Sequence, residues 1–177
     1  LILATGSKPF IPPISGAELE GVISFRDIQD VNHMLDYCKT KQNAVVIGGG
    51  LLGLEAAYGL KQQGMNVTVL HLMDRIMDRQ LDARASALLK QSIEAKGIPV
   101  LTEANTEELI GQDGHVSQLR LKDGTVLEAD FVIFAVGIRP NMALAQSAGL
   151  RCNRGVMVND TMQTFDPSIY AVGECIE

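Results

Sequence analysis

Short hydrophobic runs alternate along this chain with amphipathic segments, and this pattern predicts alternating strands and helices. Residues 44–47 are a continuous apolar run rich in β-branched residues, as is typical of a strand buried on both faces of a parallel sheet, and residues 67–70 predict a second buried strand. The segment between them, residues 51–63, carries helical spacing, and Gly64 is placed to end that helix in the left-handed conformation. Residues 44–70 therefore predict a β-α-β unit.

The same pattern predicts further elements on both sides of this unit. Amphipathic spacing indicates helices from Asp27 to about Lys41, from Asp82 to Lys96 and near residues 142–147. A Pro-rich segment, residues 8–13, is expected to be an extended loop. Further strands or extended segments are expected over residues 1–6, 98–101, 131–136, 155–158 and 169–172.

Beyond residue 102 the pattern changes to alternating segments over residues 116–121 and 125–127. The pairs Asp113-Gly114 and Asp123-Gly124 supply the positive φ angles that tight hairpin turns require, so this stretch predicts an antiparallel meander. The expected fold class is α/β, a Rossmann-like nucleotide-binding domain with a parallel sheet plus an antiparallel meander.

Composition narrows the possible partners. The chain has 177 residues, of which 46% are hydrophobic and 20% charged, so it is expected to form a packed core and not a disordered chain. Its net charge of −6 opposes a grip on phosphate backbones, and nucleic acid is not an expected partner. No apolar run approaches the roughly 18 residues that cross a bilayer, so no membrane partner is expected.

The three cysteines, Cys38, Cys152 and Cys175, are too far apart in sequence to form a zinc motif, and no metal site is predicted. A reduced, cytoplasmic chain is the simplest interpretation. Cys175 could be a redox thiol, but a lone cysteine without an activating neighbour is more often a packing residue.

Glycines carry the main functional signal. Gly48, Gly50 and Gly53 form a G-x-G-x-x-G pattern between a predicted strand and a predicted helix. The first glycine allows the tight turn, the second admits a pyrophosphate close to the backbone, and the third lets the helix approach the strand. The helix N-terminus at Leu51 and Leu52 adds N–H groups and partial positive charge, so a dinucleotide site is predicted.

The end of the second strand leaves the choice between NAD and NADP open. The usual carboxylate for the ribose 2′-OH is replaced by His71, and Asp74 and Arg75 follow. His71 could bond a 2′-OH, attract a 2′-phosphate when protonated, or be an ordinary strand-end residue. Glu55, expected in the first turn of the helix, is either favoured there by the helix dipole or lies near the nicotinamide ribose.

Four segments follow one another along the chain: Ala4-Thr-Gly6, Gly48-Gly-Gly-Leu-Leu-Gly-Leu-Glu55, Phe134-Ala-Val-Gly-Ile-Arg-Pro-Asn141 and Ile169-Tyr-Ala-Val-Gly-Glu174. In this order they resemble the pyridine nucleotide-disulphide oxidoreductase family of two-dinucleotide flavoproteins. The likeness covers essentially the whole chain and is strongest to the flavin/NAD portion of large subunits of NAD(P)H nitrite reductases, where a histidine also ends the second strand.

This resemblance implies an NAD(P)-binding domain, residues 27–138, inserted into an FAD-binding domain that contributes residues 1–26 and 139–177. It places Thr5 and Gly6 near the flavin, Gly137 beside the nicotinamide domain, and Gly173 and Glu174 in the closing motif. There the acidic side chain binds the ribityl chain. A homodimer is a further assembly that the resemblance allows.

The resemblance also implies that the chain is a fragment, since the family's own FAD-pyrophosphate glycine motif is absent and the chain opens without Met. FAD and the acceptor segments would come from the remainder of the intact protein. Nitrite reductases of this type carry sirohaem and an iron–sulphur cluster, which three scattered cysteines cannot hold.

The expected function is hydride transfer from NAD(P)H to FAD, as the electron-input module of a nitrite reductase in nitrate assimilation. No catalytic side chain is predicted, because the cofactors carry the chemistry. Two alternatives stay open. One is a fragment of a rubredoxin or ferredoxin reductase or of an NADH oxidase, and the other is a dinucleotide sensor without turnover.

Overall fold

The computed structural model describes residues 1–177, which divide into two compact units. A central unit holds Ile11–Val136, and an outer unit combines Leu1–Phe10 with Gly137–Glu177. The compact units differ from the predicted domains at two places, since residues 11–26 pack with the central unit and residues 137–138 with the outer unit. The domain boundaries inferred from the resemblance remain a prediction.

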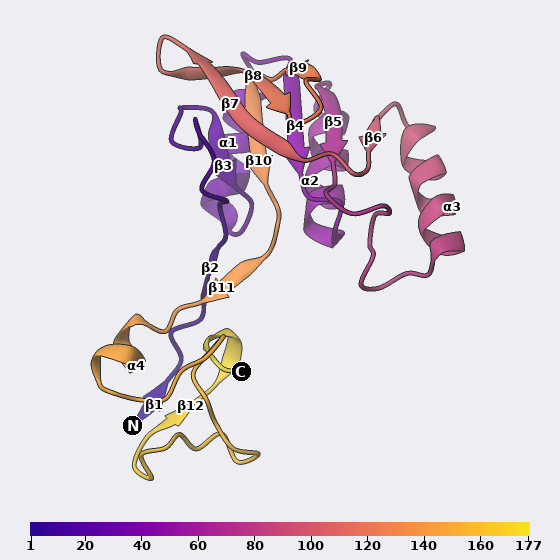
Figure 1. Ribbon diagram of the computed structural model, residues 1–177. Coiled ribbons are helices and arrows are strands. Elements are labelled where there is room, and N and C mark those ends of the chain that lie inside the picture. The colour runs from indigo at the N-terminus through magenta and orange to yellow at the C-terminus, as the bar shows by residue number, and fades with distance from the viewer. The chain divides into compact units, whose positions relative to one another are not determined.

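A five-stranded parallel sheet forms the middle of the central unit (Figure 1). The strand order is β3-β10-β4-β5-β6. The central strand β4 therefore lies between β5, which is the next strand in the sequence, and β10, which is the last strand of this sheet in the sequence. The strands are β3 (Val22–Ser24), β4 (Asn43–Ile47), β5 (Asn66–Leu70), β6 (Val100–Leu101) and β10 (Phe131–Phe134).

Three helices of the central unit begin and end where local signals place them. α1 (Ile28–Tyr37) begins with a capping box, in which the Asp27 side chain accepts from backbone N–H groups and Asp30 reaches back to the cap. α2 (Leu51–Gln62) is followed by Gly64 at φ 89°, and α3 (Ala83–Glu94) is capped by the Asp82 carboxylate. The three predicted helices are confirmed.

Alternate residues of the sheet face two different layers. On one face Val46 and Ile133 pack in a cluster with Ala56 and Leu60 of α2 and with Met34 of α1. On the other face Val45, Val132 and Phe134 pack against the meander. Because both faces are covered, the strand residues in these two clusters are apolar on both faces of the sheet, as the sequence predicted.

The meander has the predicted antiparallel pairing. β7 (Thr106–Gln112), β8 (His115–Leu121) and β9 (Val126–Glu128) pair in order. Asp113 and Gly114 turn between the first two strands with φ angles of 51° and 83°, the left-handed pair of a tight hairpin turn. The fold class predicted for this region is confirmed.

The outer unit is small and built from short elements. Parallel β1 (Ile2–Leu3) and β12 (Tyr170–Ala171) pair with each other, as do antiparallel β2 (Ser7–Pro9) and β11 (Ile138–Pro140). α4 (Ala143–Ser147) and the 3₁₀ helix η1 (Gly173–Cys175) complete it. Leu3, Ala145, Leu150, Val156, Ala171 and Cys175 form its core.

Some sequence predictions were wrong in detail. Strands β2, β3 and β11 were not predicted, and Pro9, expected in an extended loop, ends β2. Residues 155–158 form no named strand and contribute only isolated bridges at Val156. These segments depend on partners far away in sequence, and residue pattern alone does not reveal such partners.

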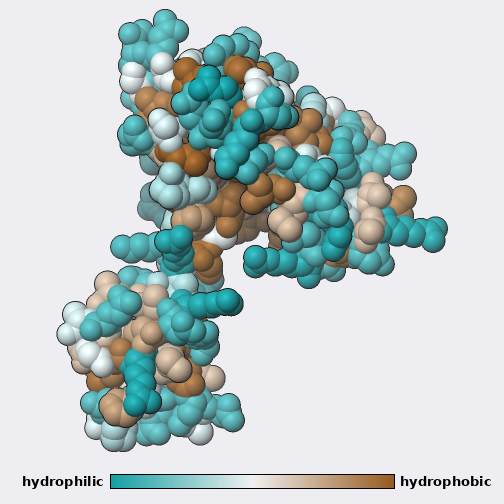
Figure 2. All heavy atoms as spheres, in the orientation of Figure 1, coloured by the Kyte–Doolittle hydropathy of each residue, from teal (hydrophilic) through white to brown (hydrophobic).

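On the face drawn in Figure 2, hydrophilic residues are mixed with smaller hydrophobic groups. No helix is long and apolar enough to cross a membrane. Several exposed large hydrophobic residues lie at the ends of sheet strands and the start of α2, where ligands bind in folds of this kind. They are Leu51, Leu52, Leu72, Met73 and Val136.

Candidate nucleotide site

The glycine turn lies at the point where the order of the strands in the sheet reverses. From β4 the chain moves outward through β5 to β6, and it then returns to β10 on the opposite side of β4. The carboxyl ends of β4 and β10 are therefore the switch point, where open α/β sheets bind ligands. The Ala135 N–H donates to Ile47 O at 2.8 Å, so the turn that follows β4 and the segment that follows β10 are adjacent.

Each glycine of the motif has a separate structural reason. Gly48 has a φ of 130°, and a Cβ there would overlap the Ala135 carbonyl. At Gly53 a Cβ would overlap the Gly48 carbonyl oxygen and would lie 3.3 Å from the Ala135 Cβ. At Gly50 a Cβ would meet nothing within 4 Å. Packing therefore requires Gly48 and Gly53, whereas the space beside Gly50 is open to a ligand.

Helix α2 presents uncapped N–H groups at this open space. Its N-cap is Gly50, which has no side chain to accept a hydrogen bond from the first turn. Leu51 and Leu52 are its first two residues, and their side chains are exposed. The first N–H groups of a helix have no acceptor within it, so they can bind an anion such as a pyrophosphate. The residues present fit a dinucleotide pyrophosphate.

Glu55 is not in the first turn of α2, and that expectation was wrong. The helix begins at Leu51, so Glu55 is its fifth residue, and the first turn contains no acidic side chain. The dipole therefore gives little reason for a carboxylate at this position. Glu55 is exposed and lines a small apolar cavity of about 170 Å³ between α1 and α2, together with Phe25 and Val31.

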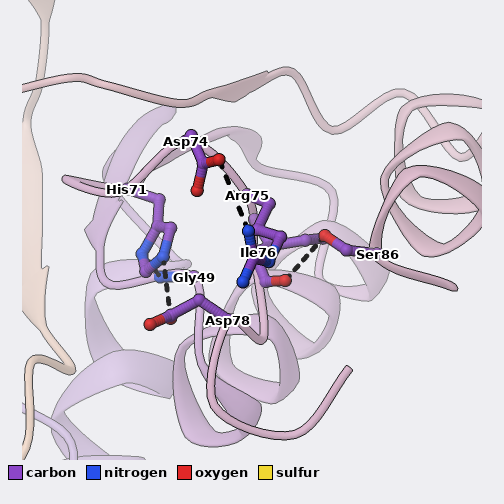
Figure 3. Close-up of polar contacts among 7 residues, drawn as sticks. All are labelled: Gly49, His71, Asp74, Arg75, Ile76, Asp78 and Ser86. Atoms are coloured by element: carbon purple, nitrogen blue, oxygen red, sulfur yellow. Dashed lines mark hydrogen bonds and ion pairs between the residues drawn. The ribbon is translucent and has the colours of Figure 1, made fainter. Parts of the chain in front are cut away.

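His71 follows β5 and contacts the glycine turn directly (Figure 3). The Gly49 N–H donates to its Nδ1 at 3.1 Å, and its Nε2 lies 3.2 Å from Asp78 Oδ1. The side chain of His71 is 12% exposed and that of Asp78 is 26% exposed. Both ring nitrogens are thus occupied within the protein, and a bond from the ring to a ribose would have to displace one of these partners.

The segment after His71 holds Gly49 from a second side. The Met77 N–H donates to Gly49 O at 2.9 Å, and Ile76 Cγ2 would lie 2.7 Å from a Cβ at Gly49. The buried Ser86 Oγ of α3 donates to Ile76 O at 2.7 Å (Figure 3). Sequence reasoning missed these contacts, because Met77 adopts a φ of 51° that its residue type does not indicate.

Asp74 and Arg75 lie in the same loop. Asp74 Oδ2 is 3.4 Å from Arg75 Nη1; the Asp74 side chain is largely exposed and the Arg75 side chain is partly buried. The Arg75 Nε is buried without a hydrogen-bond partner. A carboxylate and a guanidinium therefore follow the strand together.

The outer unit brings together the residues assigned to the flavin by resemblance. The Thr5 hydroxyl donates to Asn141 O at 2.7 Å, and the Asn141 N–H donates to Gly6 O at 2.8 Å. The neighbouring Ser7 hydroxyl donates to Glu174 Oε2 at 2.8 Å. Residues 5–7 and the closing motif are thus neighbours within one unit.

Two more predicted residues of the outer unit are glycines in the left-handed region. Gly137 has a φ of 108°, and its carbonyl accepts from the Phe10 N–H at 3.0 Å. Gly173 has a φ of 80° and begins η1. A side chain would strain both positions, which accounts for glycine there whether or not a cofactor lies nearby.

The cysteines are placed for packing. Cys175 is fully buried, its Sγ lies 3.2 Å from Val172 O, and none of the three cysteines forms a disulfide. Burial raises the pKa of the Cys38 and Cys152 thiols. No group of three or more His, Cys, Asp or Glu side chains could hold a metal ion.

We expect slow thiol alkylation in the native chain. A raised pKa leaves less thiolate at neutral pH, so Cys38 and Cys152 should react with iodoacetamide more slowly than a free thiol, and Cys175 only after unfolding. Mass spectrometry of native and denatured samples measures this, with full labelling in denaturant as the control. Rapid native labelling of Cys175 would contradict a packing role.

Comparison with known proteins gives one consistent family. The family model for pyridine nucleotide-disulphide oxidoreductases matches residues 1–177. The chain is 57% identical over its whole length to the Bacillus subtilis (strain 168) nitrite reductase [NAD(P)H], of which it covers 22%. It is 49% identical over its whole length to the assimilatory nitrate reductase electron transfer subunit of the same organism, of which it covers 23%.

A solved structure agrees with these relatives. The NAD-dependent persulfide reductase from A. fulgidus is 38% identical to this chain, with a TM-score of 0.95 over 100% of this chain and 33% of that one. The chain spans about a fifth of the length of the two curated relatives.

Proposed function

Because the chain belongs to the pyridine nucleotide-disulphide oxidoreductase family, we propose that it is the NAD(P)H-binding portion of a flavin-dependent oxidoreductase. We further propose that it is the electron-input module of a nitrite reductase, in the cytoplasm. The observation that carries the proposal is the open space at Gly50 in front of the uncapped start of α2, at the switch point of the sheet.

In this proposal the residues of the chain bind and orient the two cofactors. The N–H groups of Gly50, Leu51 and Leu52 hold the pyrophosphate of NAD(P)H, and Glu55 lies toward its nicotinamide ribose. When bound, NAD(P)H supplies a hydride and FAD accepts it. No side chain of the chain needs to act as a nucleophile or a general base in that transfer.

The outer unit is proposed to contact FAD in the complete protein. Thr5 and Gly6 would lie beside the flavin, Gly137 would lie at the nicotinamide side, and Gly173 with Glu174 would bind the ribityl chain. The hydrogen bond between Ser7 and Glu174 supports this grouping, because it keeps the closing motif beside residues 5–7.

The nitrite-reducing role is favoured over the other acceptors by similarity. The relatives that are 57% and 49% identical carry names of nitrite and nitrate metabolism, whereas an NADH oxidase and a rubredoxin-NAD(+) reductase are only 39% and 37% identical. The remaining domains of the parent protein and a second copy in a homodimer are proposed partners.

Anaerobic reduction of the flavin tests the function. We expect the flavin-loaded, full-length protein that carries this chain to lose its oxidised-flavin absorbance on addition of NADH or NADPH, and to oxidise the nucleotide continuously when nitrite is present. Binding of nucleotide without any flavin reduction would favour the sensor alternative. Turnover with rubredoxin but not with nitrite would favour the alternative that the chain is part of a rubredoxin reductase.

A further inference from the structure

The hydrogen bonds of His71 define its protonation state. A ring nitrogen that accepts from the Gly49 N–H carries no proton, so Nδ1 is bare. The single proton of the neutral ring is then on Nε2 and is donated to Asp78 Oδ1 at 3.2 Å. The two hydrogen bonds that link Asp78, His71 and Gly49 therefore require a neutral imidazole with its proton on Nε2.

Gly49 is held at both of its backbone polar groups. Its N–H is bonded to His71, and its carbonyl accepts from Met77 at 2.9 Å. The segment that supplies both bonds is fixed to α3 through Ser86. The peptide between Gly49 and Gly50 leads directly into the uncapped turn of α2, so these bonds fix how the open N–H groups are presented.

We propose that His71, held by Asp78, is a positioning residue that fixes the glycine turn for dinucleotide binding, and that protonation of His71 weakens binding. This inference rests on the proposed nucleotide site. A protonated ring carries a hydrogen on Nδ1, which then faces the Gly49 N–H, so the bond between them is lost. Affinity should therefore be lower at an acidic pH at which the ring is protonated than at a pH at which it is neutral.

The loop after His71 carries several charged residues, which besides Asp78 are Asp74, Arg75, Arg79 and Asp82. Asp78 is the carboxylate that contacts the ring. On the same loop Asp74 and Arg75 pair with each other at 3.4 Å. Glu103 lies on the segment after β6, where its N–H donates to Met73 O. The glycine turn itself carries no charged side chain.

Two substitutions at His71 distinguish a residue that positions the glycine turn from one that contacts the ribose. His71→Asn keeps a δ1 acceptor atom the same number of bonds from Cβ but cannot titrate, whereas His71→Leu removes the acceptor. Binding of NAD⁺ to the chain is measured by calorimetry between about pH 5.5 and pH 8. The matched control is His115→Asn, since His115 lies on β8 and pairs with Glu20.

The expected results follow from the loss of one hydrogen bond. His71→Leu should bind about 3- to 10-fold more weakly at pH 8, and the wild type should lose a similar factor between about pH 8 and pH 5.5. His71→Asn should bind like the wild type at high pH and should lose the pH dependence. His115→Asn should keep the wild-type pH profile.

Opposite results would overturn the inference. Equal losses for the Asn and Leu variants, accompanied by a changed preference between NAD⁺ and NADP⁺, would make His71 a ribose contact. Wild-type affinity and pH dependence in His71→Leu would remove His71 from the site.

A measurement without nucleotide separates this inference from the proposed function. In ¹⁵N NMR of the free chain, the Gly49 amide should titrate together with the His71 ring, and its hydrogen exchange should accelerate in His71→Leu but not in His71→Asn. If the Gly49 signals follow His71 in this way but NAD⁺ and NADP⁺ do not bind, the proposed function fails and the positioning role of His71 remains. If nucleotide binds but the Gly49 amide signal does not respond to the His71 ring, only the positioning role of His71 is refuted.

Discussion

Replacing Gly50 with valine is expected to raise the dissociation constant for NAD(H) at least about 100-fold while the chain stays folded. The backbone at Gly50 has φ −87° and ψ −176°, an extended conformation that valine adopts readily, and a Cβ there contacts nothing in the protein. The added side chain fills the space that the pyrophosphate must occupy beside the N–H groups of α2. Titration calorimetry with NAD⁺ or NADH measures the effect.

The control for this variant is Gly59→Val in the same helix. Gly59 also has open space around the position of a Cβ, but it lies two turns further from the N-terminus. Gly50→Val should lose on the order of 1 kcal/mol of stability because valine is a poor N-cap residue, whereas Gly59→Val should change stability little because valine is no worse a helix former than glycine. Only Gly50→Val should lose the nucleotide, and unchanged affinity would reduce the glycine motif to a structural turn.

Gly53→Ala is expected to destabilise the central unit by about 3 kcal/mol or more. The single added methyl group would overlap the Gly48 carbonyl oxygen, and a backbone atom cannot rotate away as a flexible side chain can. Either α2 must move away from β4 or the turn must open, and both changes disturb the cluster around Ala56 and Ala57. Urea unfolding followed by the helical circular dichroism signal reports this, because α1, α2 and α3 all belong to the central unit.

Gly59→Ala is the matched control for Gly53→Ala. It adds the same methyl group to the same helix where nothing lies within 4 Å, and it should stabilise the helix by about 0.5–1 kcal/mol. A Gly53→Ala chain as stable as the wild type would show that the close approach of α2 and the turn is unimportant.

Local signals explain the parts of the fold that could be predicted. The β-α-β unit was visible because apolar strands, a helical period and Gly64 all lie within one short stretch of sequence. The meander turn was visible because an Asp-Gly pair supplies two positive φ angles. In both cases the residues that determine the geometry are neighbours in the chain.

Strand β3 and the pair of β2 and β11 could not be predicted for the opposite reason. Val22–Ser24 is a strand only because β10, more than a hundred residues later, pairs with it. β2 and β11 each end on a proline, which sequence rules treat as evidence against a strand, yet an edge position tolerates it.

The candidate site shows the same division. The roles of Gly48, Gly50 and Gly53 were inferred from their spacing, and the structure shows close packing at Gly48 and Gly53 and open space at Gly50. The partners of His71 did not follow, since Asp78 lies in an irregular loop that turns at Met77. Residue spacing in a helix or strand predicts direction, but spacing in such a loop does not.

The pairing of β2 with β11 has a consequence for how this chain could be divided. Pro9 and Ile138 are partners in register, and the Phe10 N–H donates to Gly137 O at 3.0 Å. In the sequence, the whole central unit, residues 11–136, is thus an insertion between the two strands of an antiparallel pair, β2 and β11. A two-residue Asn-Gly turn could close that pair into a hairpin in its place, and the excised segment would be a cassette with its own core for grafting into other hairpins.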